Sequence, residues 1–333
     1  MNSRTRHPWV ESLKGTIGFG LQAVAAQSHG DRGAALIRAG GHAERYGFDA
    51  FFLGDHPAWA PDCWLHLSVI AARTKRVRLG QMVAAAPYRT PLLTARLQSD
   101  LDRLSAGRSI LGLGIGWNAA DYGLGSNEFD RMGLAYPPVP TRQSALEEAV
   151  AIIRGVWGPV PYSFSGQHYR AAEAQVDPPI QSGGVPLVIA GGGEKTLGQL
   201  ARLGDVANFG PGPAGNVDSP GDVQARLAVL KLQCRSAGRR YDDILRTHFT
   251  HWLILASDER TVAAKVARYF PNGLDPFWGQ YLVAGTPDQA AAFFQGFVDA
   301  GIEYFVIQTL DPDDEESISL VISELNPRLI RRP

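Results

Sequence analysis

Nearly continuous apolar runs alternate along this chain with stretches in which apolar residues recur at helical spacing. Apolar runs that lack a polar alternation are typical of strands buried on both faces. The predicted strands span residues 16–22, 50–55, 77–85, 109–115, 186–191, 206–210, 247–256 and 304–310. The predicted helices span residues 33–47, 90–107, 140–157, 222–238, 286–301 and about 314–330, with helix starts at Pro91, Thr141 and Thr286.

Eight strands in alternation with helices, without a linker rich in Ser, Gly or Pro, predict a (β/α)8 TIM barrel with loop insertions. A doubly wound open sheet is the alternative fold. We expect a single domain over residues 1–333, with insertions at about 117–140 and 158–185. The second insertion contains the segment YSFSGQHYRA, which predicts a small hairpin.

Composition narrows the class of protein. Lys and Arg number 32 and Asp and Glu 33, so the net charge of −1 gives no basic footprint for a nucleic-acid partner. The two cysteines cannot form a disulfide scaffold, and neither lies in a CxxC pair. No apolar run is long enough to span a membrane, and no signal peptide is recognisable at the N-terminus. We therefore expect a cytoplasmic protein that acts on a small-molecule substrate.

In a TIM barrel the chemistry lies at the carboxyl ends of the strands. Asp55 and His56 directly follow a predicted strand, and His is the natural proton donor or acceptor near neutral pH. The alternative is that Asp55 caps a turn and His56 is only packed. Gly114 and Gly116 lie at another strand end, where missing side chains would let a flat ring approach the backbone. The match of this segment to GxGxxG is rejected, because glycines follow where a helix would have to begin.

The segment AGGGEKT, residues 190–196, directly follows a strand and opens an amphipathic helix. Consecutive backbone N–H groups at a helix start bind anions without a basic side chain, so this loop is a candidate phosphate site. The alternative is a plain loop with a helix cap.

Two further groups of polar residues give weaker evidence of function. His248 and His251 are three residues apart on a predicted strand, so we expect them on opposite faces and unable to share a metal. The run 313–316 is interpreted as a solvated helix start whose carboxylates complement the helix dipole. We expect no metal site.

The chain resembles the luciferase-like monooxygenase superfamily, and within it the branch that uses the deazaflavin coenzyme F420. The resemblance rests on five segments that cover most of the chain in order. They are AERYGFDAFFLGDH (43–56), TKRVRLGQMVAAAPYRTP (74–91), LDRLSAGRSILGLGIGW (101–117), AGGGEKT (190–196) and VAGTPDQAAAFFQGFVDAGIEYFVIQ (283–308).

The resemblance implies a (β/α)8 barrel and assigns roles by position. Asp55 and His56 are similar to the pair that faces the flavin ring, with His56 nearest the reacting atom. Relatives that oxidise sugar phosphates carry a glutamate at the position of Trp117, so the resemblance argues against that substrate class for this chain. The implied cofactor-binding residues are Met82 and Val83, where the family makes a non-prolyl cis peptide, Gly114, Gly116, Trp117 and Asn118 beside the ring, and Ala190, Gly191, Gly192 and Gly193 at the phosphate.

Three functions follow from this resemblance. The first is hydride transfer between coenzyme F420 and a small organic substrate. The second is an FMN-dependent monooxygenase that uses O2 and receives reduced flavin from a separate reductase. The third is a flavin-binding protein without turnover, which the intact Asp55–His56 pair and the glycine loops disfavour. Members of the family are often dimers, so the resemblance implies a homodimer.

Overall fold

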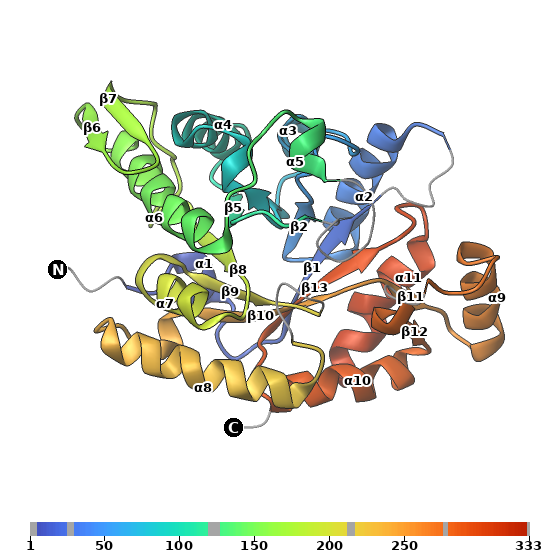
Figure 1. Cartoon of the computed structure of the whole chain (residues 1–333). Coiled ribbons are helices and arrows are strands. Elements are labelled where there is room, and N and C mark those ends of the chain that lie inside the picture. Colours follow the sequence, from blue (N-terminus) through green and yellow to red (C-terminus); the bar gives the residue numbers. More distant parts are fainter. Residues whose placement is uncertain (1–4, 25–29, 119–126, 212–216, 276–278, 332–333) are drawn as a thin grey trace.

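The computed structural model describes residues 5–24, 30–118, 127–211, 217–275 and 279–331. In these segments parallel strands form a closed barrel with helices around it (Figure 1). The strands are hydrogen-bonded in the order β3-β2-β1-β13-β10-β9-β8-β5, and pairing of β3 with β5 closes the ring. The barrel strands are β1 (Gly18–Ala23), β2 (Ala50–Leu53), β3 (Arg78–Gln81) with its short continuation β4 (Ala84–Ala85), β5 (Ser109–Gly114), β8 (Leu187–Ala190), β9 (Val206–Phe209), β10 (Leu245–Thr250) and β13 (Tyr304–Thr309). The TIM-barrel prediction is therefore confirmed.

Helices confirm the predicted ranges 33–47, 90–107, 140–157, 222–238 and 286–301, and the helices Cys63–Arg73 and Glu259–Tyr269 are not among those predicted. Many of the helix starts have side-chain caps. Thr90 caps α4 and Thr286 forms a capping box with Gln289 at α10, as the sequence indicates. The start predicted at Thr141 is wrong by two residues, because Pro138 precedes the first turn of α6. The helices are α1 (Pro8–Ser12), α2 (Arg32–Tyr46), α3 (Cys63–Arg73), α4 (Pro91–Leu104), α5 (Glu128–Arg131), α6 (Val139–Val156), α7 (Glu194–Leu203), α8 (Pro220–Ser236), α9 (Glu259–Tyr269), α10 (Pro287–Asp299) and α11 (Glu315–Leu320). None of these helices in the described segments is long and apolar enough to cross a membrane.

The core has two layers, as expected for a barrel. The larger layer lies between the strands and the surrounding helices and includes Phe19, Phe51 and Phe305. The inner layer fills the barrel itself with side chains such as Phe52, Tyr304 and Val306. The barrel is thus a packed core rather than a pore, and its free polar chemistry is confined to its ends.

The strand predicted over 247–256 is in fact two strands. β10 ends at Thr250, and β11 (Leu253–Leu255) pairs with β12 (Val283–Gly285) in a separate parallel sheet. The break lies at Trp252, whose φ of 39° is in the left-handed region that bulky residues rarely adopt. The segment predicted as a terminal helix over 314–330 also divides, into α11, a π-helical stretch Val321–Leu325 and a 3₁₀ turn Asn326–Arg328.

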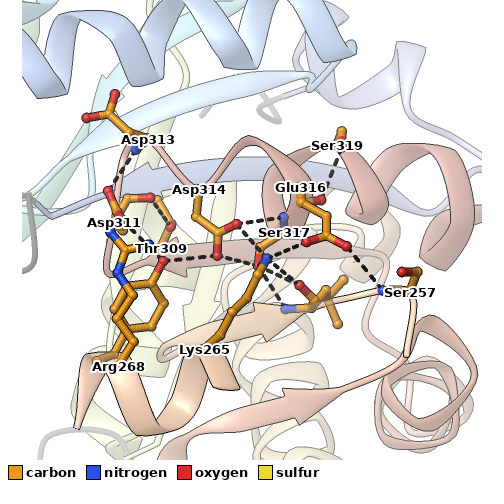
Figure 2. Close-up of polar contacts among 12 residues, drawn as sticks. Ser257, Lys265, Arg268, Thr309, Asp311, Asp313, Asp314, Glu316, Ser317 and Ser319 are labelled. Carbon is orange, nitrogen blue, oxygen red and sulfur yellow. Dashed lines mark hydrogen bonds and ion pairs between the residues drawn. The ribbon is translucent and has the colours of Figure 1, made fainter. Parts of the chain in front are cut away.

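The hairpin predicted in the second insertion is confirmed by β6 (Tyr162–Ser165) and β7 (Arg170–Ala174), which pair antiparallel. The solvated interpretation of the acidic run 313–316 is wrong in part. Figure 2 shows Asp314 and Glu316 turned towards Lys265 of α9. The Lys265 ammonium lies 2.6 Å from Asp314 and 3.1 Å from Glu316, and Asp314 also caps α11. Because the side chain of Asp314 is 7% exposed, these contacts are shielded from water and join α9 to α11.

Candidate active site

His56 lies at the carboxyl end of β2 and is held by a buried carboxylate. Its Nδ1 is 3.0 Å from Oε2 of Glu128, a residue of the first insertion that is 1% exposed. The imidazole also stacks on Trp59, with ring centroids 5.4 Å apart. The side chain of His56 is one-third exposed, so part of the imidazole is accessible to a ligand.

Glu128 receives two further hydrogen bonds, from the Tyr88 hydroxyl at 2.7 Å and from the backbone N–H of Ala58 at 3.2 Å. Burial alone would raise the pKa of Glu128, but the hydrogen bond and charge of His56 and the hydrogen bond from Tyr88 outweigh it. The pKa of Glu128 is therefore lowered from its ordinary value of 4.5. An ionised Glu128 fixes the orientation of His56 and favours a proton on Nδ1, the role that a carboxylate has beside a catalytic histidine.

Sequence reasoning missed Glu128 altogether. The residue is 72 positions from His56 and starts the four-residue helix α5 inside a segment interpreted only as an irregular insertion. The one available signal is Asn127, whose side chain caps this helix.

Asp55 does not face the barrel mouth as a free acid. It is 3% exposed and accepts two hydrogen bonds from the Arg89 guanidinium, at 2.6 and 3.0 Å. The Cys63 thiol lies 3.6 Å from the same carboxylate, and burial together with the Asp55 charge raises the pKa of that thiol. The catalytic role assigned to Asp55 stays a prediction, and the geometry favours a positioning role at the strand end.

The peptide bond between Met82 and Val83 is cis, at the place that the family resemblance implies. The Met82 carbonyl accepts a hydrogen bond from Gln22 Nε2 at 2.6 Å, and Gln22 Oε1 accepts one from Gln308 Nε2 at 2.6 Å. These amides come from the neighbouring strands β1 and β13. They form a buried polar layer directly below the barrel mouth.

Gly114 and Gly116 both lie close to side chains of the protein itself. A Cβ atom at Gly114 would lie 2.9 Å from Val83 Cγ2, and one at Gly116 would lie 2.8 Å from the Phe129 ring. A side chain at either position would therefore collide with Val83 or with Phe129 of α5. The contact of these glycines with a cofactor stays a prediction.

The segment that carries Trp117 and Asn118 is shaped by Arg142 of α6. The Arg142 guanidinium donates hydrogen bonds to the carbonyls of Ile115 and Gly116 and lies over the Tyr136 ring, 4.0 Å from its centroid. Asn118 is buried and Trp117 is partly exposed. The chain beyond Asn118 leaves the described residues until Asn127.

The loop from Ala190 to Gly193 joins β8 to α7, a ten-residue helix. Gly191 has a φ of 123°, which favours glycine, and Gly193 is the N-cap of α7 without a side-chain hydrogen bond to the first turn. The first N–H groups of α7 therefore lack a side-chain acceptor, which fits a ligand phosphate at this position. Gly192 is buried and Gly193 is exposed, so the loop is accessible to a ligand at Gly193. Among the residues that the structure describes, no group of three or more His, Cys, Asp or Glu could hold a metal ion.

The sequence profile of the luciferase-like monooxygenase family matches residues 17–291, from the start of β1 into α10. The chain belongs to the luciferase-like monooxygenase family. The matched range includes the His56–Glu128 pair, the Met82–Val83 cis peptide and the loop before α7, so all parts of this luciferase-like site lie within it.

Among curated relatives, the chain is 27% identical over 316 residues to the F420-dependent glucose-6-phosphate dehydrogenase of Kineococcus radiotolerans, with 86% of this chain and 90% of the relative covered. Two solved structures share the fold of this luciferase-like protein at low identity. The F420-dependent tetrahydromethanopterin reductase of Methanopyrus kandleri is 21% identical with a TM-score of 0.76, covering 95% of this chain and 100% of its own. The oxygenating constituent of 3,6-diketocamphane monooxygenase of Pseudomonas putida, in complex with FMN, is 16% identical with a TM-score of 0.73, covering 95% and 100%.

Proposed function

We propose that this protein is a coenzyme F420-dependent oxidoreductase that transfers a hydride between the deazaflavin and a small organic substrate. The observation that carries the proposal is the His56–Glu128 pair at a barrel end that also has an uncapped helix start. Curated relatives named as F420-dependent dehydrogenases support the choice of cofactor.

In this proposal the chain's own residues bind, orient and move protons. The first turn of α7 and the loop before it, Gly191 to Gly193, hold the cofactor phosphate. The Met82–Val83 segment, fixed by Gln22, lies behind the ring system. When bound, the deazaflavin supplies a ring carbon that accepts or releases a hydride.

His56 exchanges the accompanying proton with the substrate through Nε2, while Glu128 holds Nδ1. A positioned general acid or base of this kind contributes about 10²- to 10⁴-fold to a rate. Arg89 fixes Asp55 and so the backbone on which His56 is carried. Glu128 and Arg89 are positioning residues in this scheme.

We propose further that the substrate is not a sugar phosphate, although curated relatives are named for glucose 6-phosphate. The family resemblance implies a glutamate at the position of Trp117 in relatives that oxidise sugar phosphates. Two arginines near His56 and Trp117 are also engaged by protein groups, Arg89 by Asp55 and Arg142 by backbone carbonyls. An uncharged substrate would not require either of them.

The FMN-dependent monooxygenase is the second candidate, favoured by the fold shared with an FMN-bound monooxygenase. Titration of the purified protein with F420 and with FMN, followed by cofactor fluorescence, separates the candidates. Tight binding of F420 with weak binding of FMN supports the proposal. Tight FMN binding, with O2 consumption when reduced FMN is supplied, would replace it with the second candidate. Binding of neither cofactor would overturn both.

A further inference from the structure

A second cavity lies outside the barrel wall, at the carboxyl end of β10. Its volume is about 260 Å³, and it lies between β10 and α10. The His248 ring forms part of the wall, with its centroid 4.2 Å from that of Phe297 on α10. His248 also packs against Phe305, a residue of the core layer between the strands and the surrounding helices. The cavity therefore lies on the outer, helix-facing side of β10, whereas His56 lies at the end of β2.

Both histidines of the 248–251 segment line this cavity, contrary to the expectation that they face opposite ways. Strand alternation would have separated them, but β10 ends at Thr250 and the chain turns through the left-handed Trp252. His251 stacks on Trp252, with ring centroids 4.8 Å apart. The unusual backbone at Trp252 thus accompanies a wall that carries two imidazoles.

The lining is nearly free of charge. Among the described residues around the cavity, Asp218 is the one carboxylate and there is no Lys or Arg. Burial lowers the pKa of His248 to about 3 and that of His251 to about 4, so both imidazoles are neutral near pH 7. A ligand with a phosphate or carboxylate group would find no compensating cation here, and its desolvation would be unfavourable.

The remaining wall combines aromatic rings with a few polar atoms. Phe293 and Phe297 contribute ring surface, and the Thr250 hydroxyl lies 3.1 Å from His248 Nδ1. An apolar cavity of about 150 Å³ is enough to hold benzene, so the larger volume here accommodates one substituted ring. Apolar walls with a small number of polar groups are typical of small-molecule sites.

We propose that this cavity binds an uncharged organic molecule with a single ring, at a site separate from the barrel mouth. The ring packs against Phe293 and Phe297, and a polar substituent of the ligand bonds to Thr250 or to a neutral imidazole. Ala290, which is 2% exposed and faces the cavity from α10, sets its depth.

The test compares two probes of nearly equal shape and different charge, para-fluorobenzamide and para-fluorobenzoate, by fluorine NMR line broadening with the full-length protein. We expect the amide signal to broaden and the benzoate signal to stay sharp. Ala290→Leu should abolish the broadening by filling the cavity. Ala292→Leu, an equal change at an exposed position of the same helix that does not line the cavity, should leave the broadening unchanged.

If Ala290→Leu does not fold, Phe293→Ala decides, because Phe293 is partly exposed and its loss should weaken amide binding at least fivefold. Equal broadening of both probes, or broadening that survives both substitutions, would overturn the proposal. Displacement of the amide by F420 would also overturn it, since the site would then be the barrel mouth. The F420 titration of the proposed function is an independent measurement, so either proposal can fail without the other.

Discussion

The two ends of this barrel use polar side chains in opposite ways. At the amino end the charges pair with one another. Glu303 lies 2.6 Å from both Arg246 and Arg331, and Arg239 lies 3.6 Å from Asp205. A cavity of about 760 Å³ at this end is lined mostly by such charged residues. At the carboxyl end Arg89 also pairs with Asp55, but His56 is oriented by Glu128 and its side chain stays one-third exposed.

The difference shows that charge alone does not mark a site in this fold. The amino end has a cavity lined by ionic groups, yet many of these groups pair with one another, which gives stability rather than binding. At the carboxyl end, a helix start without a side-chain cap and an oriented imidazole remain for a ligand. Substitutions at the two ends should therefore separate activity from stability.

The largest expected effect is on the rate, at the carboxyl end. His56→Ala should lower hydride transfer about 10²- to 10⁴-fold and leave the F420 dissociation constant within about twofold, because a proton donor or acceptor is lost while the phosphate site is intact. Stopped-flow measurement of F420 absorbance checks this. His66→Ala, a histidine of α3 bonded to the Asp62 carbonyl, is the control and should keep the parent rate. An unchanged rate in His56→Ala would remove the role assigned to His56.

The converse experiment is at the amino end. Glu303→Gln should lower the free energy of unfolding by about 3 kcal/mol, because the buried Arg246 loses the carboxylate at 2.6 Å and keeps the exposed Asp242, 3.9 Å away, as its nearest counter-charge among the described residues. The turnover of the folded fraction should not change. Urea unfolding measures the first quantity and a steady-state assay the second. Glu324→Gln breaks an exposed pair with Arg328 and should cost less than about 0.5 kcal/mol. A loss of turnover in folded Glu303→Gln would contradict the division between the ends.

Lowering the pH should lower the free energy of unfolding through His248, which lines the cavity beside the carboxyl end of β10. Burial lowers the pKa of His248 from 6.5 to about 3, so the unfolded chain takes up a proton that the folded chain refuses. The resulting stability is complete above pH 6.5 and is lost as the pH falls from 6.5 towards 3. Between pH 7 and pH 5 His248 should account for a loss of about 2 kcal/mol. Urea unfolding at both pH values should show a smaller loss in His248→Phe than in the parent; equal losses would contradict this account of His248.

A smaller effect on kcat should follow from substitution of Glu128, the partner of His56. Glu128→Gln keeps the size of the side chain and removes its charge, so we expect about a tenfold fall in kcat with little change in the F420 dissociation constant. Tyr88→Phe removes a different hydrogen bond from the same carboxylate and should have a weaker effect on kcat. A larger change in cofactor binding than in kcat would place Glu128 at the cofactor rather than behind His56.

The barrel could be predicted from the sequence, and so could those parts of the candidate site that directly follow a strand. Continuous apolar strands and capped helices are local patterns, and Asp55–His56 and the loop at Gly191 follow directly from strand ends. Glu128 could not be predicted, because its meeting with His56 depends on how an insertion folds back. The close contact of Gly114 with Val83 could not be predicted for the same reason, because it depends on the tertiary structure. The break at Trp252 is a backbone conformation that no residue preference indicates.

The most direct test of the central claim is the F420 affinity of two variants at the loop before α7. Gly192→Asp and Gly192→Asn add side chains of nearly equal size, and only the first adds a negative charge where the cofactor phosphate is proposed to lie. Fluorescence titration of each purified variant should give an F420 dissociation constant at least about tenfold higher for Asp than for Asn, with the gap narrowing as salt is added. Equal dissociation constants for the two variants would contradict the claim that this end of the barrel holds the anionic part of the cofactor.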